Sequence, residues 1–267
     1  MKISIPDMIE SAASQGFLGE NAEAKVCQDL ILKAISESRL SKNATIKGGV
    51  VMRSFSSSAR RATLDIDVDF IRYSIENDSL DAFISQLNCL EGVRFERAGE
   101  IEELRQQDYR GRRAHIRISD GTGYSIVSKV DFGVHKDLDI KQEFYCFEVA
   151  CYDGKAELLI NSKEQMVAEK VKSLLRFGPR STRYKDIFDI HYLLPLCDPK
   201  ALDGCFSKYV FSDSKMRERS YSDVKDRLAR TFGDALYSRR LKESGKNWTD
   251  APTEKVFADI LAFFDRH

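Results

Sequence analysis

The sequence of 267 residues has no excess charge of either sign, because 42 Lys and Arg residues balance 42 Asp and Glu residues. A field that attracts nucleic acid along the whole chain is therefore excluded, and any site for a polyanion must be a local cluster. No apolar run approaches the roughly 20 residues that span a bilayer. The first residues, MKISIPDMIE, lack the apolar core of a signal peptide. We therefore expect a cytoplasmic protein with no membrane partner.

Motifs for zinc binding and for histidine-based hydrolysis are also missing. The six cysteines are scattered and no two form a CxxC pair, which argues against a zinc ribbon. We expect them to be reduced thiols in the core of a cytosolic protein. The four histidines show no metal-ligand spacing, so hydrolysis by paired His and Asp ligands is not expected.

Hydrophobic periodicity divides the chain into a first part with strands and helices and a second, helical part. The first part contains predicted helices over 6–14, 20–38 and 80–90, one that starts at Val50, and predicted strands over 44–47, 64–70, 93–96, 113–118, 124–134 and 144–149. The second part contains predicted helices over 163–177, 182–194, 221–236 and 253–265. We therefore expect an α+β fold, with a mixed sheet flanked by helices over residues 1–160 and a helical domain over residues 161–267.

Three aspartates alternate in the predicted strand LDIDVDF, residues 64–70. Residues two apart share a face, so Asp65, Asp67 and Asp69 lie on one side, while Leu64 and the other apolar residues face the core. The like charges repel, and a divalent cation resolves the conflict. Mg²⁺ prefers oxygen ligands and usually takes one or two carboxylates together with substrate phosphates. Aspartate is a poor strand former, which favours metal binding over acidic decoration of a solvated face.

A further carboxylate is predicted on strand 124–134. Asp131 shares a strand face with Lys129. If strand 124–134 pairs with strand 64–70, Asp131 supplies a further carboxylate as a third metal ligand. The alternative, an exposed Asp131 paired with Lys129, explains the pattern equally well.

The pair Gly48-Gly49 separates a predicted strand from a predicted helix. Glycine lets the backbone approach an anion closely, and a helix N-terminus offers free N–H groups to phosphate. Arg53, Arg60 and Arg61 follow as phosphate partners. A GG turn alone usually only makes a turn. Followed by the DxD strand, it predicts a phosphate cradle beside a metal site, as nucleotide chemistry needs.

Two charges fall on the inward faces of the next two helices. At ~100° per residue, Lys170 lies within the apolar stripe of helix 163–177, and Asp186 within that of helix 182–194, with Asp189 at its edge. A buried Lys170–Asp186 salt bridge between packed helices is the interpretation that the helical wheel slightly favours. The functional alternative is a lysine directed at substrate phosphates, with Asp186 lining the same cleft.

Two groups of basic residues stand out in the neutral chain. Such runs usually form solvated faces, but together they are able to hold a phosphate backbone through salt-sensitive contacts. The groups are Lys170, Lys172, Arg176, Arg180, Arg183 and Lys185, and Arg105, Arg110, Arg112, Arg113 and Arg117.

The segments KGGVVMR, RATLDID and EKVKSLLRFGPRSTRYKDIFDIHYLL together resemble the AbiEii/AbiGii-type nucleotidyltransferase toxin family, a branch of the DNA polymerase β-like nucleotidyltransferases. The family pattern is a GG turn, an R-x-T/S-x-D-I-D strand, an E-K helix and an R-x-K-D-x-x-D helix, and all occur in order across residues 46–194. Many members place Ser or Thr after GG. This chain has Val50, which leaves only backbone N–H groups for phosphate there.

The resemblance implies a nucleotidyltransferase-like fold whose helical domain completes the active-site cleft. It also implies that Asp65 and Asp67 hold Mg²⁺ or Mn²⁺, that Lys170 contacts nucleotide phosphates, and that Asp186 completes the site. The implied substrate is an NTP and the acceptor is the 3′ end of tRNA or another RNA. The protein is then the toxin of a toxin–antitoxin or phage-defence system, with a cognate antitoxin protein as its partner.

In the predicted reaction Gly48, Gly49 and Arg53 cradle the triphosphate, and Asp131 or Asp186 helps to deprotonate the acceptor. The alternative is a non-catalytic nucleotide-binding module that acts through a protein partner, although the intact D-I-D and E-K elements favour catalysis. A metal-dependent phosphohydrolase would use the same carboxylates and release phosphate rather than pyrophosphate.

Overall fold

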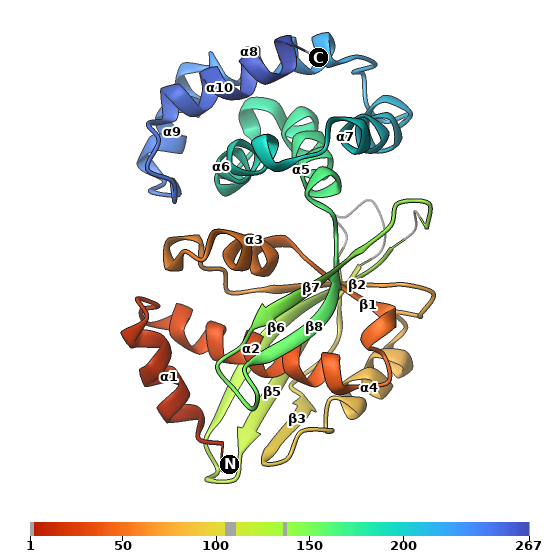
Figure 1. Cartoon of the computed structure of the whole chain (residues 1–267), viewed down its shortest axis with the longest axis vertical. Coiled ribbons are helices and arrows are strands. Elements are labelled where there is room, and N and C mark those ends of the chain that lie inside the picture. The colour runs from red at the N-terminus through yellow and green to blue at the C-terminus, as the bar shows by residue number, and fades with distance from the viewer. Residues whose placement is uncertain (1–2, 105–110, 136–137, 267) are drawn as a thin grey trace. The chain divides into compact units, whose positions relative to one another are not determined.

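The computed structural model describes residues 3–104, 111–135 and 138–266 and has an α+β fold (Figure 1). The chain divides into two compact units, Met1–Asn161 and Ser162–His267. The first unit combines strands and helices, and the second is helical. Within the described ranges, no helix is both long enough and apolar enough to cross a membrane.

The first unit carries its helices before and between its strands. The helices are α1 (Ile5–Ser14), α2 (Glu20–Glu37), α3 (Gly48–Ser56) and α4 (Asn77–Gln86). The strands are β1 (Ala44–Lys47), β2 (Ile66–Phe70), β3 (Val93–Arg97), β4 (Glu102–Leu104), β5 (Gly111–Asp120), β6 (Ser125–Val134), β7 (Glu143–Glu148) and β8 (Lys155–Ile160).

The described strands form one eight-stranded sheet in the order β3-β5-β6-β2-β1-β8-β7, with β4 paired to β5. The sheet is mixed, because β2 runs parallel to β6 and β1 runs parallel to β8, whereas β1 and β2 are antiparallel. Asp67 on β2 is opposite Lys47 on β1 and opposite Asp131 on β6. This register brings the carboxylates of Asp67 and Asp131 to neighbouring positions near the middle of the sheet.

The two faces of the sheet differ in chemistry. On one face Ile66, Val68 and Phe70 are fully buried, and helix α2 packs on β6 and β8 while α4 packs on β3 (Figure 1). The opposite face carries charged residues at the alternate positions, and we call it the polar face. Its charged members on β1, β2, β5 and β6 are Lys47, Asp67, Asp69, Arg113, Arg117, Lys129 and Asp131.

The alternation predicted for strand 64–70 is confirmed from Ile66 onward. The prediction that Leu64 faces the core is wrong: the strand begins only at Ile66, and Leu64 is 47% exposed. All six cysteines are free. Cys27, Cys151 and Cys205 are buried, but Cys89 and Cys146 are exposed, so the core prediction is wrong for those two.

The second unit consists of helices that pack on one another. They are α5 (Lys163–Phe177), α6 (Tyr184–Leu193), α7 (Pro199–Phe206), α8 (Tyr221–Phe232), α9 (Ala235–Glu243) and α10 (Thr253–Asp265). Helix α5 begins after Ser162, whose hydroxyl accepts a hydrogen bond from the Gln165 N–H at 3.1 Å, and it ends at Gly178, where φ is +53°. Helix α6 packs against α5, which sets Lys170 opposite Asp186.

Candidate functional site

Asp67 lies on β2 against the start of helix α3. A Cβ atom built on Gly48 would stand 2.0 Å from Asp67 Oδ2, far closer than a non-bonded contact allows. Gly48 also has φ +68°, a conformation that side-chain-bearing residues rarely adopt. Glycine at position 48 therefore lets a carboxylate meet the first residue of a helix.

Gly49 serves a second contact of the same helix. A Cβ atom built on Gly49 would stand 2.6 Å from both Cβ and Oγ1 of Thr63. Thr63 belongs to the segment that leads into β2, so this contact holds that segment on the first turn of α3. The predicted strand–GG–helix arrangement is confirmed, except that the helix begins at Gly48 rather than Val50. Phosphate binding by this turn stays a prediction.

Three of the predicted carboxylates are each paired with a Lys or Arg side chain from a strand of the same sheet. They are Asp65, Asp69 and Asp131. The pairs are Lys129 Nζ with Asp65 Oδ1 at 2.6 Å, Lys47 Nζ with Asp69 Oδ1 at 2.7 Å, and Arg113 Nε and Nη2 with the two oxygens of Asp131 at 2.7 and 2.9 Å. The alternative pairing of Lys129 with Asp131 is wrong, because Arg113 stands directly opposite Asp131 in the sheet. Hydrogen bonding to Asp131 raises the pKa of Arg113 above its ordinary value, against the effect of burial.

Asp65 and Asp67 fit a hard divalent cation by the type of their donor atoms. Asp65 Oδ1 is a buried atom without a hydrogen bond of acceptable geometry, and the cation beside it is the Lys129 ammonium. No group of three or more His, Cys, Asp or Glu side chains is arranged to hold a metal in the part of the chain that the structure describes. Asp131 gives both oxygens to Arg113. Two carboxylates with substrate phosphates nevertheless make the donor set that Mg²⁺ usually takes.

Arg53, predicted to contact the triphosphate, faces α2 instead. Its side chain is 5% exposed, its Nη1 donates to Gln28 Oε1, and its Nη2 lies 3.8 Å from Asp29 Oδ1. Its guanidinium lies 5.9 Å from the ring centroid of Phe17. These contacts tie α3 to α2, so we assign Arg53 a structural role and leave it out of the site.

The other predicted basic residues are spread over different surroundings. Arg105 and Arg110 lie outside the described residues. Arg112 belongs to the opposite face of β5 from Arg113, as the alternation along the strand requires. Arg61 is buried and Arg60 is exposed. Of the described members of the second predicted basic cluster, Arg113 and Arg117 therefore share the polar face, and Arg112 does not.

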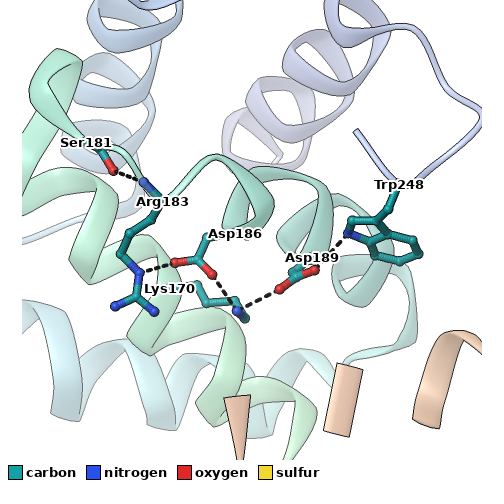
Figure 2. Close-up of polar contacts among 6 residues, drawn as sticks. All are labelled: Lys170, Ser181, Arg183, Asp186, Asp189 and Trp248. Carbon is teal, nitrogen blue, oxygen red and sulfur yellow. Dashed lines mark hydrogen bonds and ion pairs between the residues drawn. The ribbon is translucent and has the colours of Figure 1, made fainter. Parts of the chain in front are cut away.

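A buried charge cluster joins α5 and α6 in the second unit. Figure 2 shows Lys170 between two aspartates, with Arg183 and Trp248 on their outer sides. Lys170 Nζ donates to Asp186 Oδ1 at 2.6 Å and to Asp189 Oδ2 at 2.8 Å. Arg183 Nε donates to Asp186 Oδ2 at 2.6 Å, and Trp248 Nε1 donates to Asp189 Oδ1 at 2.9 Å. Every carboxylate oxygen of this cluster therefore has a donor.

The predicted Lys170–Asp186 salt bridge is confirmed, with both residues buried. Asp189, placed at the edge of the apolar stripe by the helical wheel, is fully buried, and Trp248 was not predicted as a member. Asp189 lies three residues after Asp186 on one helix, and this spacing was the signal that could have predicted Asp189 as a member of the cluster. Contact of Lys170 with nucleotide phosphates, and completion of the active-site cleft by residues 161–267, stay predictions.

A carboxylate-bearing strand beside the first turn of a glycine-initiated helix is an arrangement suited to enzymes that transfer phosphoryl or nucleotidyl groups. The family model named "Nucleotidyl transferase AbiEii toxin, Type IV TA system" matches residues 30–261. The chain therefore belongs to the AbiEii nucleotidyltransferase toxin family, and it is a nucleotidyltransferase. The match reaches beyond the motifs of residues 46–194 and includes α7, α8 and α9. A comparison with curated proteins gave no match.

Proposed function

We propose that the protein uses Mg²⁺ or Mn²⁺ to move a nucleotide from an NTP to the 3′ end of tRNA, and that a cognate antitoxin neutralises it. Membership in a family of nucleotidyltransferase toxins of type IV toxin–antitoxin systems supports the reaction class and the antitoxin. The observation that supports the metal and phosphate roles is the contact of Asp67 with Gly48, because a carboxylate oxygen lies there beside a helix N-terminus.

In this proposal Asp65 and Asp67 bind the metal, which neutralises charge on the triphosphate when it is bound. Gly48 and Gly49 add no side chain of their own to the first turn of α3, and in this proposal its N–H groups bind phosphate oxygens. The acceptor 3′-hydroxyl attacks the α-phosphorus, and the bond to the pyrophosphate leaving group breaks.

The remaining proposed contacts come from side chains with acid, base or cation chemistry. Asp131 or Asp186 receives the proton of the acceptor hydroxyl. Lys170 balances the negative charge of the phosphates. Both aspartates are held by an arginine, Arg113 for Asp131 and Arg183 for Asp186, which fixes each carboxylate in orientation.

The direct test incubates the protein with total tRNA, Mg²⁺ and each α-labelled NTP in turn. We expect labelled RNA and release of pyrophosphate. Asp65→Ala and Asp67→Ala should each lower the labelling rate by about 10³-fold or more, because several kcal/mol of transition-state stabilisation is lost. Asp78→Ala removes an exposed carboxylate in the first turn of α4 and should keep the normal rate.

Circular dichroism and thermal unfolding establish that each variant keeps its fold. Normal labelling by Asp65→Ala would contradict the assignment of the metal ligands. Calorimetric binding of NTP and metal without any labelling would favour the non-catalytic module. Release of free phosphate instead of pyrophosphate would favour a phosphohydrolase.

A further inference from the structure

The polar face of the sheet neutralises its own carboxylates. The Lys129–Asp65 pair joins β6 to the residue just before β2, and the other two pairs join β1 to β2 and β5 to β6. Two of these three carboxylates, those of Asp65 and Asp131, were predicted as metal ligands from the sequence. A cation supplied by the chain itself therefore stands beside a carboxylate that the metal needs.

The Lys129–Asp65 pair is the most exposed of the three. Its side chains are 34% and 37% exposed, against 27% and 12% for Arg113–Asp131 and 16% and 6% for Lys47–Asp69. Solvent screens such a pair and lowers the cost of separating it. An incoming ion can therefore reach Asp65 more easily than the other two paired carboxylates.

The geometry of this pair resembles contact with an ion more than a directed hydrogen bond. Lys129 Nζ lies 2.6 Å from Asp65 Oδ1, yet that oxygen has no hydrogen bond of acceptable geometry. By contrast, Arg113 makes two aligned hydrogen bonds to Asp131, a bidentate pair that is stronger and fixed in direction. A lysine ammonium is a compact charge on a flexible stem, which suits it to exchange between partners.

We propose that Lys129 is an internal counterion that competes with the divalent metal for Asp65. One oxygen cannot hold both cations at the same position, so metal binding displaces the ammonium. The phosphates of an NTP then give the released ammonium a new anionic partner. Lys129 thereby couples metal binding to nucleotide binding, and it holds the metal affinity of the nucleotide-free protein low.

This inference rests on the proposed metal role of Asp65 and Asp67 and adds a residue that neither the motifs nor the family match assigns. Its test measures metal binding and needs no turnover. The probe is Mn²⁺, whose free-ion electron paramagnetic resonance signal falls on binding. Titrations are run with and without a non-hydrolysable NTP analogue, using the four bases in turn.

The key variant is Lys129→Met, which keeps an unbranched side chain of nearly the same length and removes its charge. We expect it to bind Mn²⁺ about tenfold more tightly than the unmodified protein without nucleotide. The analogue should tighten Mn²⁺ binding in the unmodified protein and have a smaller effect in the variant. Lys129→Arg retains a cation and should keep low affinity without nucleotide.

Lys155→Met is the matched control, because it removes one positive charge from an exposed position on β8 of the same sheet. It should leave Mn²⁺ affinity unchanged. An equal gain from Lys155→Met would overturn the inference, since the effect would then reflect net charge alone. Thermal unfolding of all variants establishes that they fold.

Two results separate this inference from the proposed function. If Asp65→Asn weakens Mn²⁺ binding but Lys129→Met does not strengthen it, the competition is absent and the metal site stands. If no protein binds Mn²⁺ in a manner that depends on Asp65, with or without the analogue, the metal assignment falls and the inference falls with it.

Discussion

The Oδ2 atom of Asp67 fills the space in which any residue other than glycine would carry its Cβ at position 48, since the two atoms would be 2.0 Å apart. The observed position of the Asp67 carboxylate therefore requires glycine at position 48. The GG turn and the DxD strand, which the sequence separates, meet in a single contact. A change at the glycine should act on the carboxylate.

Gly48→Ala is expected to push the Asp67 carboxylate out of its position and to strain a backbone with φ +68°. A displacement of about 1 Å at a reacting group can cost about 10²-fold in rate, so labelling of RNA by NTP should fall by at least that factor. The strained backbone should lower the free energy of unfolding by about 1–3 kcal/mol. The labelling assay and urea unfolding measure the two effects.

Gly92→Ala separates the strain from the clash. Gly92 has φ +81°, and a Cβ built there has no atom within 4 Å. This variant should lose stability for the same backbone reason and keep the normal labelling rate. Equal loss of labelling in both variants would show that strain alone, and not the contact with Asp67, accounts for the effect.

The buried cluster of α5 and α6 predicts a second set of effects. Lys170→Met leaves Asp186 with Arg183 but removes the lysine that Asp189 shares, and Asp189 is fully buried. Removing one partner of a buried ion pair typically costs about 3–5 kcal/mol of stability. Trp248→Phe removes only one hydrogen-bond donor from Asp189 and should cost about 1–3 kcal/mol. Urea unfolding measures both.

A double variant distinguishes stability from phosphate binding by Lys170. Lys170→Met combined with Asp189→Asn removes one charge of each sign, and it should recover part of the lost stability. Labelling should stay low if Lys170 contacts the phosphates. Return of both stability and labelling would show that the lysine is only structural. Trp248 is the only tryptophan of the chain, so its fluorescence reports unfolding of the helical unit.

Asp120 predicts a dependence of stability on pH. Burial acts to raise the pKa of this carboxyl, but hydrogen bonds from Thr122, Ile5 and Tyr124 outweigh it and hold the pKa below its ordinary value of 3.8. The folded state therefore favours the ionised form. Its stabilising effect is complete above the unfolded pKa and is lost as the pH falls through the lower folded pKa.

The measurement compares Asp120→Ala with the unmodified protein by urea unfolding across pH. At pH 7 the variant should be less stable by about 2–3 kcal/mol, because a buried charged acceptor of several hydrogen bonds is gone. The difference should narrow once the pH falls below about 4. A difference that stays constant down to pH 3 would exclude the ionised carboxylate as its source.

The secondary structure was predictable where hydrophobic period and end signals coincide. Strand 44–47 and helix 163–177 have the predicted bounds, because Gly48 ends the first and Ser162 caps the second. The predicted helix 221–236 is divided between α8 and α9 by Gly233 and by Asp234, whose side chain caps α9. Strands β4 and β8 and helix α7 were missed, and β4, with three residues, is too short to show a period.

The candidate site was predictable as a set of faces, but its pairings were not. Alternation alone places Asp65, Asp67 and Asp69 on one side of a strand. Which cation neutralises each carboxylate depends on the register between β2, β5 and β6, and long-range packing sets that register. Arg53 shows the same limit, because its position in a basic loop resembled a phosphate site until packing on α2 gave it other partners.

The last prediction concerns Arg53. A phosphate contact predicts that its removal raises the KM for NTP, whereas the observed packing on α2 predicts that its removal lowers stability. Arg53→Met removes the donor to Gln28 Oε1 and one cation near Asp29, which keeps Lys25 and the Ala150 N–H at 2.9 Å. We expect a loss of about 1–3 kcal/mol in stability with an unchanged KM for NTP.

Arg60→Met is the comparison for Arg53→Met, because Arg60 is exposed in the same predicted phosphate loop. A surface substitution of this kind should change stability by no more than about 0.5 kcal/mol. Thermal unfolding and NTP titration of the labelling rate measure both variants. A raised KM for NTP in Arg53→Met at unchanged stability would mean that the guanidinium binds phosphate after all. The contacts with α2 would then have to break when the nucleotide binds.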